Sequence, residues 1–480
     1  MGNFSDESLY SKGLEQFKKN QLDNSLNFLL SIKNKNLNTF KLISQIHIKK
    51  DDFKNAKLFL SKILDLDKNN LFALNSLGDL NKSKKNYKEA EEFYIKSISC
   101  DENFAPAYFN LASLYEDKGD LKLARKHYLK VIEIDNKNYA AFFNLQRLDE
   151  NFINDEIIQK IINELKISQN LKNKNTAYCH FILANYYRKK KEINSEIKEL
   201  SKGHEIFFNL DRMNKDAVKY WLETVPKMIN KNFLFRKNDN NKIELTSIEP
   251  IFIFGIPRSG TTLVETIITS GKEKIYNAGE NFVLQKTLHK SQLNKRIYES
   301  EDSITLDIDF LRKDIVESYK KQLSIQSKKF KFIDRTMTNF FFAEILLEIF
   351  PNAKIINCQR DSFHNLVAIY QQCLNNLPWS HKVKDIKKYI SIYNYKMNNL
   401  EKNYNKNILN VELKKLTEFP EDTSKEIMSF CKLNWSEKVL KYYERKDLIC
   451  TTASNIQIRE KIFKYDSAKF LPYKDYFDYF

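Results

Sequence analysis

Residues 251–265 read Ile-Phe-Ile-Phe-Gly-Ile-Pro-Arg-Ser-Gly-Thr-Thr-Leu-Val-Glu. The four apolar residues at 251–254 have the pattern of a short buried strand, Gly255 interrupts it, and an apolar helical run begins near Leu263. A strand, a tight turn and a helix N-terminus predict an anion site, because free backbone N–H groups and the positive end of the helix dipole point to one place.

The spacing of two glycines distinguishes this loop from the phosphate loop of nucleotide hydrolases. Gly255 and Gly260 are two of only nine glycines among 480 residues. Thr261 and Thr262 follow them, whereas a nucleotide-hydrolysing loop carries Lys and then Ser or Thr. Arg258, inside the loop, is the available cation. At this point an ordinary strand–turn–helix of another α/β domain is still an alternative.

The loop Gly-Ile-Pro-Arg-Ser-Gly-Thr-Thr-Leu at 255–263 resembles the 5′-phosphosulfate loop of sulfotransferases that use 3′-phosphoadenosine 5′-phosphosulfate (PAPS). Their bacterial and tyrosylprotein-type members carry G-x-P-R-S-G-T-T-L after the first strand, and every specified position is matched. The resemblance implies a P-loop-like α/β domain with a central parallel sheet, related to nucleotide kinases. It also implies that the 5′-phosphosulfate is bound by Gly255, Pro257, Arg258, Ser259, Gly260, Thr261 and Thr262.

Two later segments resemble the family's catalytic segments. Tyr276-Asn-Ala-Gly-Glu-Asn281 resembles G-A-G-E, which makes Glu280 the candidate general base for a hydroxyl acceptor. A carboxylate that only positions the loop is the alternative. Asp-Arg-Thr-Met-Thr-Asn-Phe at 334–340 resembles D-K-M-P-x-N-F, whose lysine contacts the transferring sulfuryl group. Arg335 takes that position with a planar fork in place of a point charge. Arg258 and Arg335 are expected to stabilise the sulfuryl charge without a metal.

The segment that binds the adenosine end of PAPS is matched only in part. Pro351–Asp361 resembles F-P-N-A-K-I-I-x-x-x-R-D-P, in which the arginine, here Arg360, binds the 3′-phosphate. The serine that completes this site in the family is Ala368, which removes a hydroxyl worth about 1–3 kcal/mol unless a group such as Asn365 replaces it. The family's tyrosine near the adenine is Leu413.

The last family segment lies near the C-terminal end of the chain. Thr452-Ala-Ser-Asn-Ile-Gln-Ile-Arg459 resembles T-A-S-x-x-Q-V-R, which implies that Ser454 lies near sulfuryl or phosphate oxygens. Lys469, followed by Phe470, stands where the family has Arg or Lys before Trp, and it is expected to contact phosphate. The matched segments run from Glu249 to Tyr473 in the family's order.

The N-terminal part of the chain repeats itself. Ala56, Ala90 and Ala124 are spaced by 34 residues, and columns of aspartate and of leucine or isoleucine keep the same period. This helix–turn–helix period, with small residues at the helix contacts, is the tetratricopeptide signature. Such arrays stack into a superhelix. Both a surface for a protein or peptide ligand and a structural stalk remain open.

These patterns predict a multidomain chain. We expect an all-α tetratricopeptide array over 1–150, a helical extension with a further repeat-like hairpin and a linker over 151–246, and the sulfotransferase domain over 247–480. The linker itself is expected at 230–247, which is rich in Asn and Lys and has no apolar period.

Composition narrows the function classes. The net charge of +17 would suit nucleic acid, but the lysines are spread along the whole chain, which favours a solvated basic surface that attracts anionic substrates instead. Apolar runs are too short to span a bilayer, and six scattered cysteines indicate a cytoplasmic protein. Seven scattered histidines show no metal-ligand spacing. One of them, His381, either borders the acceptor pocket or lies on the surface.

The sequence therefore predicts a PAPS-dependent sulfotransferase that transfers a sulfuryl group to a hydroxyl or amine of a peptide, a sugar or a small molecule. The first alternative is a tetratricopeptide binding scaffold whose sulfotransferase-like domain no longer turns over, because Ala368 and Leu413 erode the adenosine site. A nucleotide-dependent kinase is disfavoured, since Thr261 stands at the position of the phosphate-loop lysine.

Overall fold

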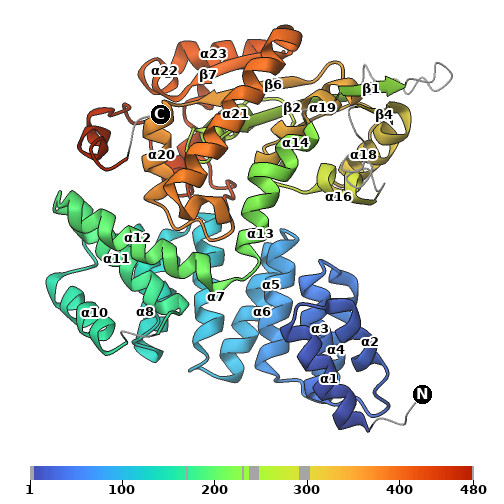
Figure 1. Ribbon diagram of the computed structural model, residues 1–480, viewed down its shortest axis with the longest axis vertical. Coiled ribbons are helices and arrows are strands. Elements are labelled where there is room, and N and C mark those ends of the chain that lie inside the picture. The colour runs from blue at the N-terminus through green and yellow to red at the C-terminus, as the bar shows by residue number, and fades with distance from the viewer. Residues whose placement is uncertain (1–4, 169–170, 230–231, 237–247, 291–302, 478–480) are drawn as a thin grey trace. The chain divides into compact units, whose positions relative to one another are not determined.

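The computed structural model describes residues 5–168, 171–229, 232–236, 248–290 and 303–477. The chain separates into two compact units, Met1–Asn154 and Asp155–Phe480. Figure 1 shows that the described part of the first unit is wholly helical, whereas the second combines helices with strands. Among the described helices, none has the length and apolar character that a bilayer span requires.

The first unit is a row of helix pairs in which small residues lie at the helix contacts. Ala56, Ala90 and Ala124 are fully buried. A Cβ atom at Gly78 would lie 2.4 Å from the ring of Tyr94, so the close approach of these two helices requires glycine. The prediction of helical hairpins with a 34-residue period is confirmed. The helices are α1 (Asp6–Lys18), α2 (Leu22–Leu30), α3 (Leu37–Lys49), α4 (Phe53–Leu66), α5 (Leu71–Ser83), α6 (Tyr87–Cys100), α7 (Ala105–Lys118), α8 (Leu121–Ile134) and α9 (Tyr139–Leu148).

The second unit begins with helices, before its sheet. The hairpin expected after the array is formed by α11 (Lys174–Lys189) and α12 (Ile193–Leu210), and it belongs to this second unit. The other helical segments before the sheet are α10 (Asp155–Ile167), α13 (Asn214–Lys219), a π-helical turn (Tyr220–Thr224) and α14 (Val225–Ile229).

One short strand corrects the expected linker. Five residues of the expected linker form β1 (Asn232–Arg236), which pairs in parallel with β4 (Ser303–Asp307). Phe233 and Phe235 lie on one face of β1 with their ring centroids 6.3 Å apart, an alternation that is too short to stand out among Asn and Lys. Residues 237–247 of the expected linker lie outside the described residues. The domain boundaries at residues 150 and 246 stay predictions.

The centre of the second unit is a five-stranded, all-parallel sheet with the order β3-β5-β2-β6-β7. This confirms the prediction of an α/β domain with a central parallel sheet. After β2 the chain passes first to the β3 and β5 side and then to the β6 and β7 side, so the strand order reverses beside β2. The strands are β2 (Ile248–Gly255), β3 (Tyr276–Gly279), β5 (Phe330–Asp334), β6 (Lys354–Gln359) and β7 (Ile408–Glu412).

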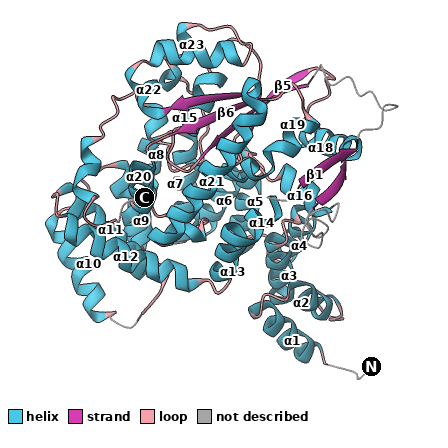
Figure 2. Cartoon of the chain, turned by 45° about the horizontal axis from the view of Figure 1, so that its top comes forward, coloured by secondary structure: helices cyan, strands magenta, loops and turns pink. Residues whose placement is uncertain are grey.

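Helices cover both faces of the sheet. Alternate side chains of β2 point to opposite faces, so they pack into two different layers of helices. Ile251 and Ile253 belong to a core cluster with apolar residues of α15 (Thr261–Thr269). Phe252 belongs to the opposite layer, with its ring centroid 6.3 Å from that of Phe350. Figure 2 shows the strands among helices. The other described helical segments are α16 (Val283–Lys290), α18 (Ile308–Gln322), the 3-10 turn Met337–Phe342, α19 (Ala343–Ile349), α20 (Ser362–Tyr370), the 3-10 turn Pro378–His381, α21 (Val383–Tyr404), the 3-10 turn Asn405–Asn407, α22 (Leu413–Glu418), α23 (Pro420–Phe430) and the 3-10 turns Glu437–Val439, Tyr442–Glu444, Gln457–Arg459 and Ala468–Tyr473.

Candidate active site

The loop between β2 and α15 lies at the carboxyl end of the central strand, where the strand order reverses. Open α/β sheets bind their ligands at this point. A Cβ atom at Gly255 would lie 2.4 Å from Ser259 Oγ, and Gly260 has a φ angle of +98°, so both positions require glycine. Arg258 also has a positive φ, +72°, which few residues other than glycine adopt. Backbone strain of this kind is concentrated at functional sites.

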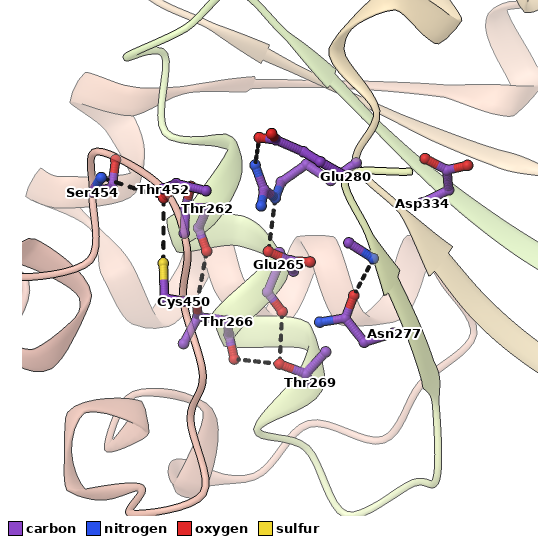
Figure 3. Close-up of polar contacts among 12 residues, drawn as sticks. Thr262, Glu265, Thr266, Thr269, Asn277, Glu280, Asp334, Cys450, Thr452 and Ser454 are labelled. Atoms are coloured by element: carbon purple, nitrogen blue, oxygen red, sulfur yellow. Dashed lines mark hydrogen bonds and ion pairs between the residues drawn. The ribbon is translucent and has the colours of Figure 1, made fainter. Parts of the chain in front are cut away.

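Hydrogen-bond donors of this loop are available to an anion. Helix α15 begins at Thr261, so its first backbone N–H groups have no acceptor within the helix. Ser259 is buried, and within the described residues its Oγ has no hydrogen-bond partner. Thr262 Oγ1 lies 3.3 Å from Thr452 Oγ1, which joins the C-terminal segment to this helix (Figure 3).

Arg258 joins the loop to the last family segment. Its Nη1 donates to Ser454 Oγ and its Nη2 donates to Gln457 Oε1, each at 2.9 Å. The structure therefore brings together Arg258 and Ser454, two of the predicted cofactor-binding residues. The contact with Gln457 was not predicted, although its position three residues after Ser454 was an available indication.

Arg335 lies between two carboxylates that come from different elements. Its Nε donates to Glu265 Oε2 at 2.7 Å and its Nη1 donates to Glu280 Oε1 at 2.6 Å. Figure 3 shows how the side chains of Glu265, from α15, and Glu280, after β3, converge. Burial alone would lower the pKa of Arg335, but the two carboxylates outweigh burial and raise it. The guanidinium therefore keeps its charge in a buried position.

Asp334 holds the turn from which Arg335 projects. Its buried carboxylate accepts hydrogen bonds from the hydroxyl of Tyr319 and, at 2.8 Å, from the backbone N–H of Thr336. Burial raises the pKa of Asp334, although these hydrogen bonds act in the opposite direction. The backbone N–H of Arg335 donates to Gly279 O at 3.0 Å. Asp334, which matches the family pattern, thus orients the turn that carries Arg335.

Arg360 meets the loop from the end of β6. Its Nη1 donates to the backbone carbonyl of Arg258 at 2.9 Å. Its Nε donates to Tyr465 Oη at 3.1 Å, and its guanidinium carbon lies 4.9 Å from the ring centroid of Phe470. His364 stacks on Phe470 with 4.6 Å between ring centroids, and its Nδ1 lies 2.9 Å from Tyr465 Oη. Aromatic side chains of the C-terminal segment therefore fix the direction of Arg360.

A pocket with a volume of about 740 Å³ opens beside Arg360. Ser259, Arg360 and Asn365 are among its lining residues. Lys469 lies near Arg360. Burial, followed by the positive charge of Arg360, lowers the pKa of Lys469. Arg360 and Lys469 therefore lie close enough for their charges to interact, and Arg360 lines the pocket together with the acidic residues Asp361 and Glu412.

The departures from the family pattern have structural consequences at this pocket. Asn365 Nδ2 donates to Pro257 O at 3.2 Å, which joins α20 to the loop. Its Oδ1 is buried and has no partner among the residues that the structure describes. Leu413 packs on the loop, since its Cδ1 would lie 2.9 Å from a Cβ atom at Gly260. Leu413 thus supports the loop backbone. The family's serine hydroxyl is missing at Ala368, and its replacement by Asn365 stays a prediction.

The sulfotransferase family model matches residues 250–437, and the tetratricopeptide-repeat model matches residues 42–70, 73–104 and 105–138. The chain thus contains a sulfotransferase-family domain and tetratricopeptide repeats. An uncharacterized protein of Aquifex aeolicus is 26% identical over 336 residues, which are 67% of this chain and 43% of that relative. The chain therefore spans less than half of that relative's length.

Two solved structures of sulfotransferases are distantly similar. The sulfotransferase domain from the Synechococcus PCC 7002 olefin synthase is 17% identical, and the match covers 46% of this chain and 85% of that one with a TM-score of 0.33. For a sulfotransferase from Mycobacterium tuberculosis the identity is 13%, the coverage 60% and 92%, and the TM-score 0.26.

Two residues of the second unit that contact the predicted site arginines belong to none of the family motifs. Glu265 had a weak indication, because it is an acidic residue within the apolar helical run after the loop. Tyr465 had none, since its contact with Arg360 joins residues 105 positions apart. Over the described part of the chain, no cluster of three or more His, Cys, Asp or Glu side chains is arranged to hold a metal ion.

The same unit holds a buried histidine pair. His204 Nε2 donates to the backbone carbonyl of Tyr370 at 2.8 Å, and its Nδ1 lies 3.0 Å from Nδ1 of His381. Burial lowers the pKa of His204 to about 3 and that of His381 to about 4. His381 is therefore a buried residue, and the expectation that such a histidine lies on the surface is wrong.

Proposed function

We propose that the second unit transfers a sulfuryl group from PAPS to a hydroxyl or amine of an acceptor. The observation that carries this proposal is the placement of Arg258, Arg335 and Arg360 at the carboxyl ends of adjacent parallel strands, around one glycine loop. Sulfuryl and phosphate groups are anions, and the family match covers this region. The acceptor is a peptide, a sugar or a small molecule.

The residues present fit PAPS. Its 5′-phosphosulfate would be held by the loop N–H groups, by the hydroxyls of Ser259, Thr261 and Thr262, and by Ser454. Its 3′-phosphate would be held by Arg360 and Lys469. The pocket of about 740 Å³ has the size that nucleotide-sized ligands need. When bound, PAPS supplies the sulfuryl group together with a phosphate leaving group.

The charged residues of the chain have two further tasks in this proposal. Arg258 and Arg335 stabilise negative charge on the sulfuryl oxygens from fixed positions, which is usually the largest catalytic contribution. Glu280 has a side chain that is 58% exposed, so an acceptor hydroxyl can reach it, and it takes the hydroxyl proton as general base. The alternative role of Glu280 is to hold Arg335 only, because the two are hydrogen-bonded.

Calorimetry with 3′-phosphoadenosine 5′-phosphate tests the proposed binding. We expect the full chain to bind this nucleotide, and Arg360→Ala to weaken binding by roughly 10- to 100-fold, as for the loss of charge-assisted hydrogen bonds. Arg212→Ala, at an exposed position of the same unit, is the matched control and is expected to bind as the wild type does. No binding by the wild type at millimolar nucleotide would refute the proposal and favour a scaffold without turnover.

Incubation with labelled PAPS and a cell extract identifies the acceptor and measures turnover. If Glu280 is the general base, Glu280→Gln is expected to reduce turnover by roughly 10²- to 10⁴-fold with little change in nucleotide affinity. A smaller reduction would assign Glu280 to the positioning of Arg335 alone. Absence of any labelled acceptor would favour the scaffold.

The first unit has tetratricopeptide repeats, which indicate protein interaction. We propose that it binds an acidic protein segment with an exposed apolar side chain. Helices α6, α7 and α8 line a cleft of about 780 Å³ that presents apolar Ile95 and Leu129 beside Lys122 and Lys126. Loss of peptide binding in a Lys122→Glu, Lys126→Glu variant would support this ligand class.

All six cysteines are free, which supports the proposed cytoplasmic location.

A further inference from the structure

The C-terminal segment at 465–477 is attached to the helical hairpin that precedes the sheet. Tyr473 Oη donates to Glu196 Oε2 at 2.7 Å, a contact between residues 277 positions apart. Tyr476 Oη donates to Asn194 Oδ1 on the same helix, α12. The hairpin α11–α12 therefore holds the end of the chain.

Glu196 is the centre of this attachment. Its carboxylate is 0% exposed, and it accepts hydrogen bonds from three separate elements. The donors are Arg188 Nε of α11 at 2.7 Å, Gln371 Nε2 after α20 at 3.1 Å, and Tyr473 Oη. A buried charge is costly unless it is paired and hydrogen-bonded, and a buried ion pair adds little stability over an apolar pair. We therefore expect this network to specify one arrangement of the three elements.

The attached segment also forms one side of the candidate anion site. Tyr465 is hydrogen-bonded to Arg360, and the ring of Phe470 lies beside the guanidinium. Lys469, Phe470 and Tyr473 belong to a single 3-10 turn, Ala468–Tyr473. A displacement of Tyr473 from Glu196 therefore displaces Lys469 and Phe470 relative to Arg360.

We propose that Glu196 is a positioning residue of the sulfotransferase site. By holding Tyr473, it fixes the turn that carries Lys469 and Phe470 against Arg360, and so it sets how well the site discriminates nucleotides with a 3′-phosphate. This inference rests on the function proposed above. It makes the α11–α12 hairpin, which lies outside the matched family region 250–437, a working part of the site.

Hydrogen exchange of the full chain, without ligand, tests the attachment. Glu196→Gln removes the charge, and Tyr473→Phe removes only the hydroxyl and keeps the test available if the first variant fails to fold. We expect the amides of residues 465–477 to exchange roughly 10-fold faster in both variants, because a hydrogen bond to a charged group is lost. Glu205→Gln is the matched control, since Glu205 lies on the same helix with a side chain that is 62% exposed, and its exchange is expected to be unchanged.

Calorimetry tests the positioning role. The affinity of each variant is measured for 3′-phosphoadenosine 5′-phosphate and for adenosine 5′-phosphate, which lacks the 3′-phosphate. We expect the affinity for 3′-phosphoadenosine 5′-phosphate, divided by that for adenosine 5′-phosphate, to fall roughly 10-fold in Glu196→Gln and Tyr473→Phe. General destabilisation would instead lower the affinity for both nucleotides and preserve this ratio. Unchanged exchange in both variants, or an unchanged ratio, would overturn the proposal. Failure of the wild-type chain to bind either nucleotide would refute the proposed function instead, and the exchange comparison would still decide whether Glu196 holds the segment.

Discussion

Replacement of Arg335 by Met removes the cation between Glu265 and Glu280 and leaves a side chain of similar length. Glu265 is only 7% exposed, and it then loses the partner that lies at 2.7 Å. Breaking a buried ion pair in this way costs about 3–5 kcal/mol. The contact with Glu280 adds less than about 1 kcal/mol, because that side chain is 58% exposed. We therefore expect Arg335→Met to lower the free energy of unfolding of the second unit by about 3–5 kcal/mol.

The distribution of tryptophans makes this measurement specific. The three tryptophans, Trp221, Trp379 and Trp435, all belong to the second unit. Urea unfolding followed by tryptophan fluorescence therefore reports on that unit and not on the repeat array. Lys331→Met is the matched control, because Lys331 lies on β5, the strand that Arg335 directly follows, and pairs with the partly exposed Glu249 at 3.2 Å. Its expected effect is below about 1 kcal/mol, with unchanged turnover.

A double variant separates the stabilising role of Arg335 from its proposed catalytic role. Arg335→Met combined with Glu265→Leu replaces the buried ion pair by apolar side chains and is expected to regain most of the lost stability. Turnover is expected to fall roughly 10²- to 10³-fold in both the single and the double variant, because the fixed cation is missing from both. Recovery of turnover in the double variant would show that Arg335 acts only in folding. An unchanged free energy of unfolding in the single variant would refute the buried ion pair.

Arg258→Ala is expected to reduce turnover of labelled PAPS by roughly 10²- to 10³-fold, since one preorganised cation is lost; near-normal turnover would contradict the role of Arg258. Gly255→Ala places a Cβ atom 2.4 Å from Ser259 Oγ, so it is expected to lower the free energy of unfolding by about 1–3 kcal/mol. An unchanged midpoint of urea unfolding would contradict this expectation. Burial lowers the pKa of His204 to about 3 and that of His381 to about 4, from 6.5. Between about pH 6.5 and 4 the unfolded chain therefore binds protons that the folded unit does not, and stability falls as the pH falls by about 1.4 kcal/mol per pH unit for each histidine. His381→Phe is expected to reduce that slope in tryptophan-monitored unfolding, and an unchanged slope would count against the assignment.

The features that the sequence predicted are those encoded within short stretches. The strand, the turn and the start of the helix around the glycine loop are consecutive in residues 251–263, so the local pattern determined them. The helical hairpins follow from a 34-residue period, because buried alanines such as Ala90 recur at each helix contact. The fold class and the position of the anion loop could therefore be predicted. The family resemblance assigned Arg258, Ser454 and Arg360 to separate parts of one cofactor site, and the structure brings Ser454 and Arg360 into contact with Arg258.

The features that the sequence did not predict depend on contacts between distant residues. Glu265 and Tyr465 bind residues 70 and 105 positions away, and no periodicity describes such pairs. Strand β1 was missed for a related reason: its short Phe-Leu-Phe centre gains its meaning only from pairing with β4, which lies far along the chain.

The α11–α12 hairpin is a further example, because sequence periodicity does not show which element a helical hairpin packs against. The prediction of a repeat-like hairpin implies that the hairpin packs against another element, but it does not say which one. Its buried polar side chains are more informative, because Glu196 and His204 need donors and acceptors that a column of alanines and leucines does not offer. They find these partners on the hydroxyl of Tyr473 and the backbone carbonyl of Tyr370, both in the unit that holds the sheet. A glutamate and a histidine on the inner face of a repeat-like helix therefore indicate that the helix packs against elements other than repeats, and here those elements belong to the same unit and border the candidate active site.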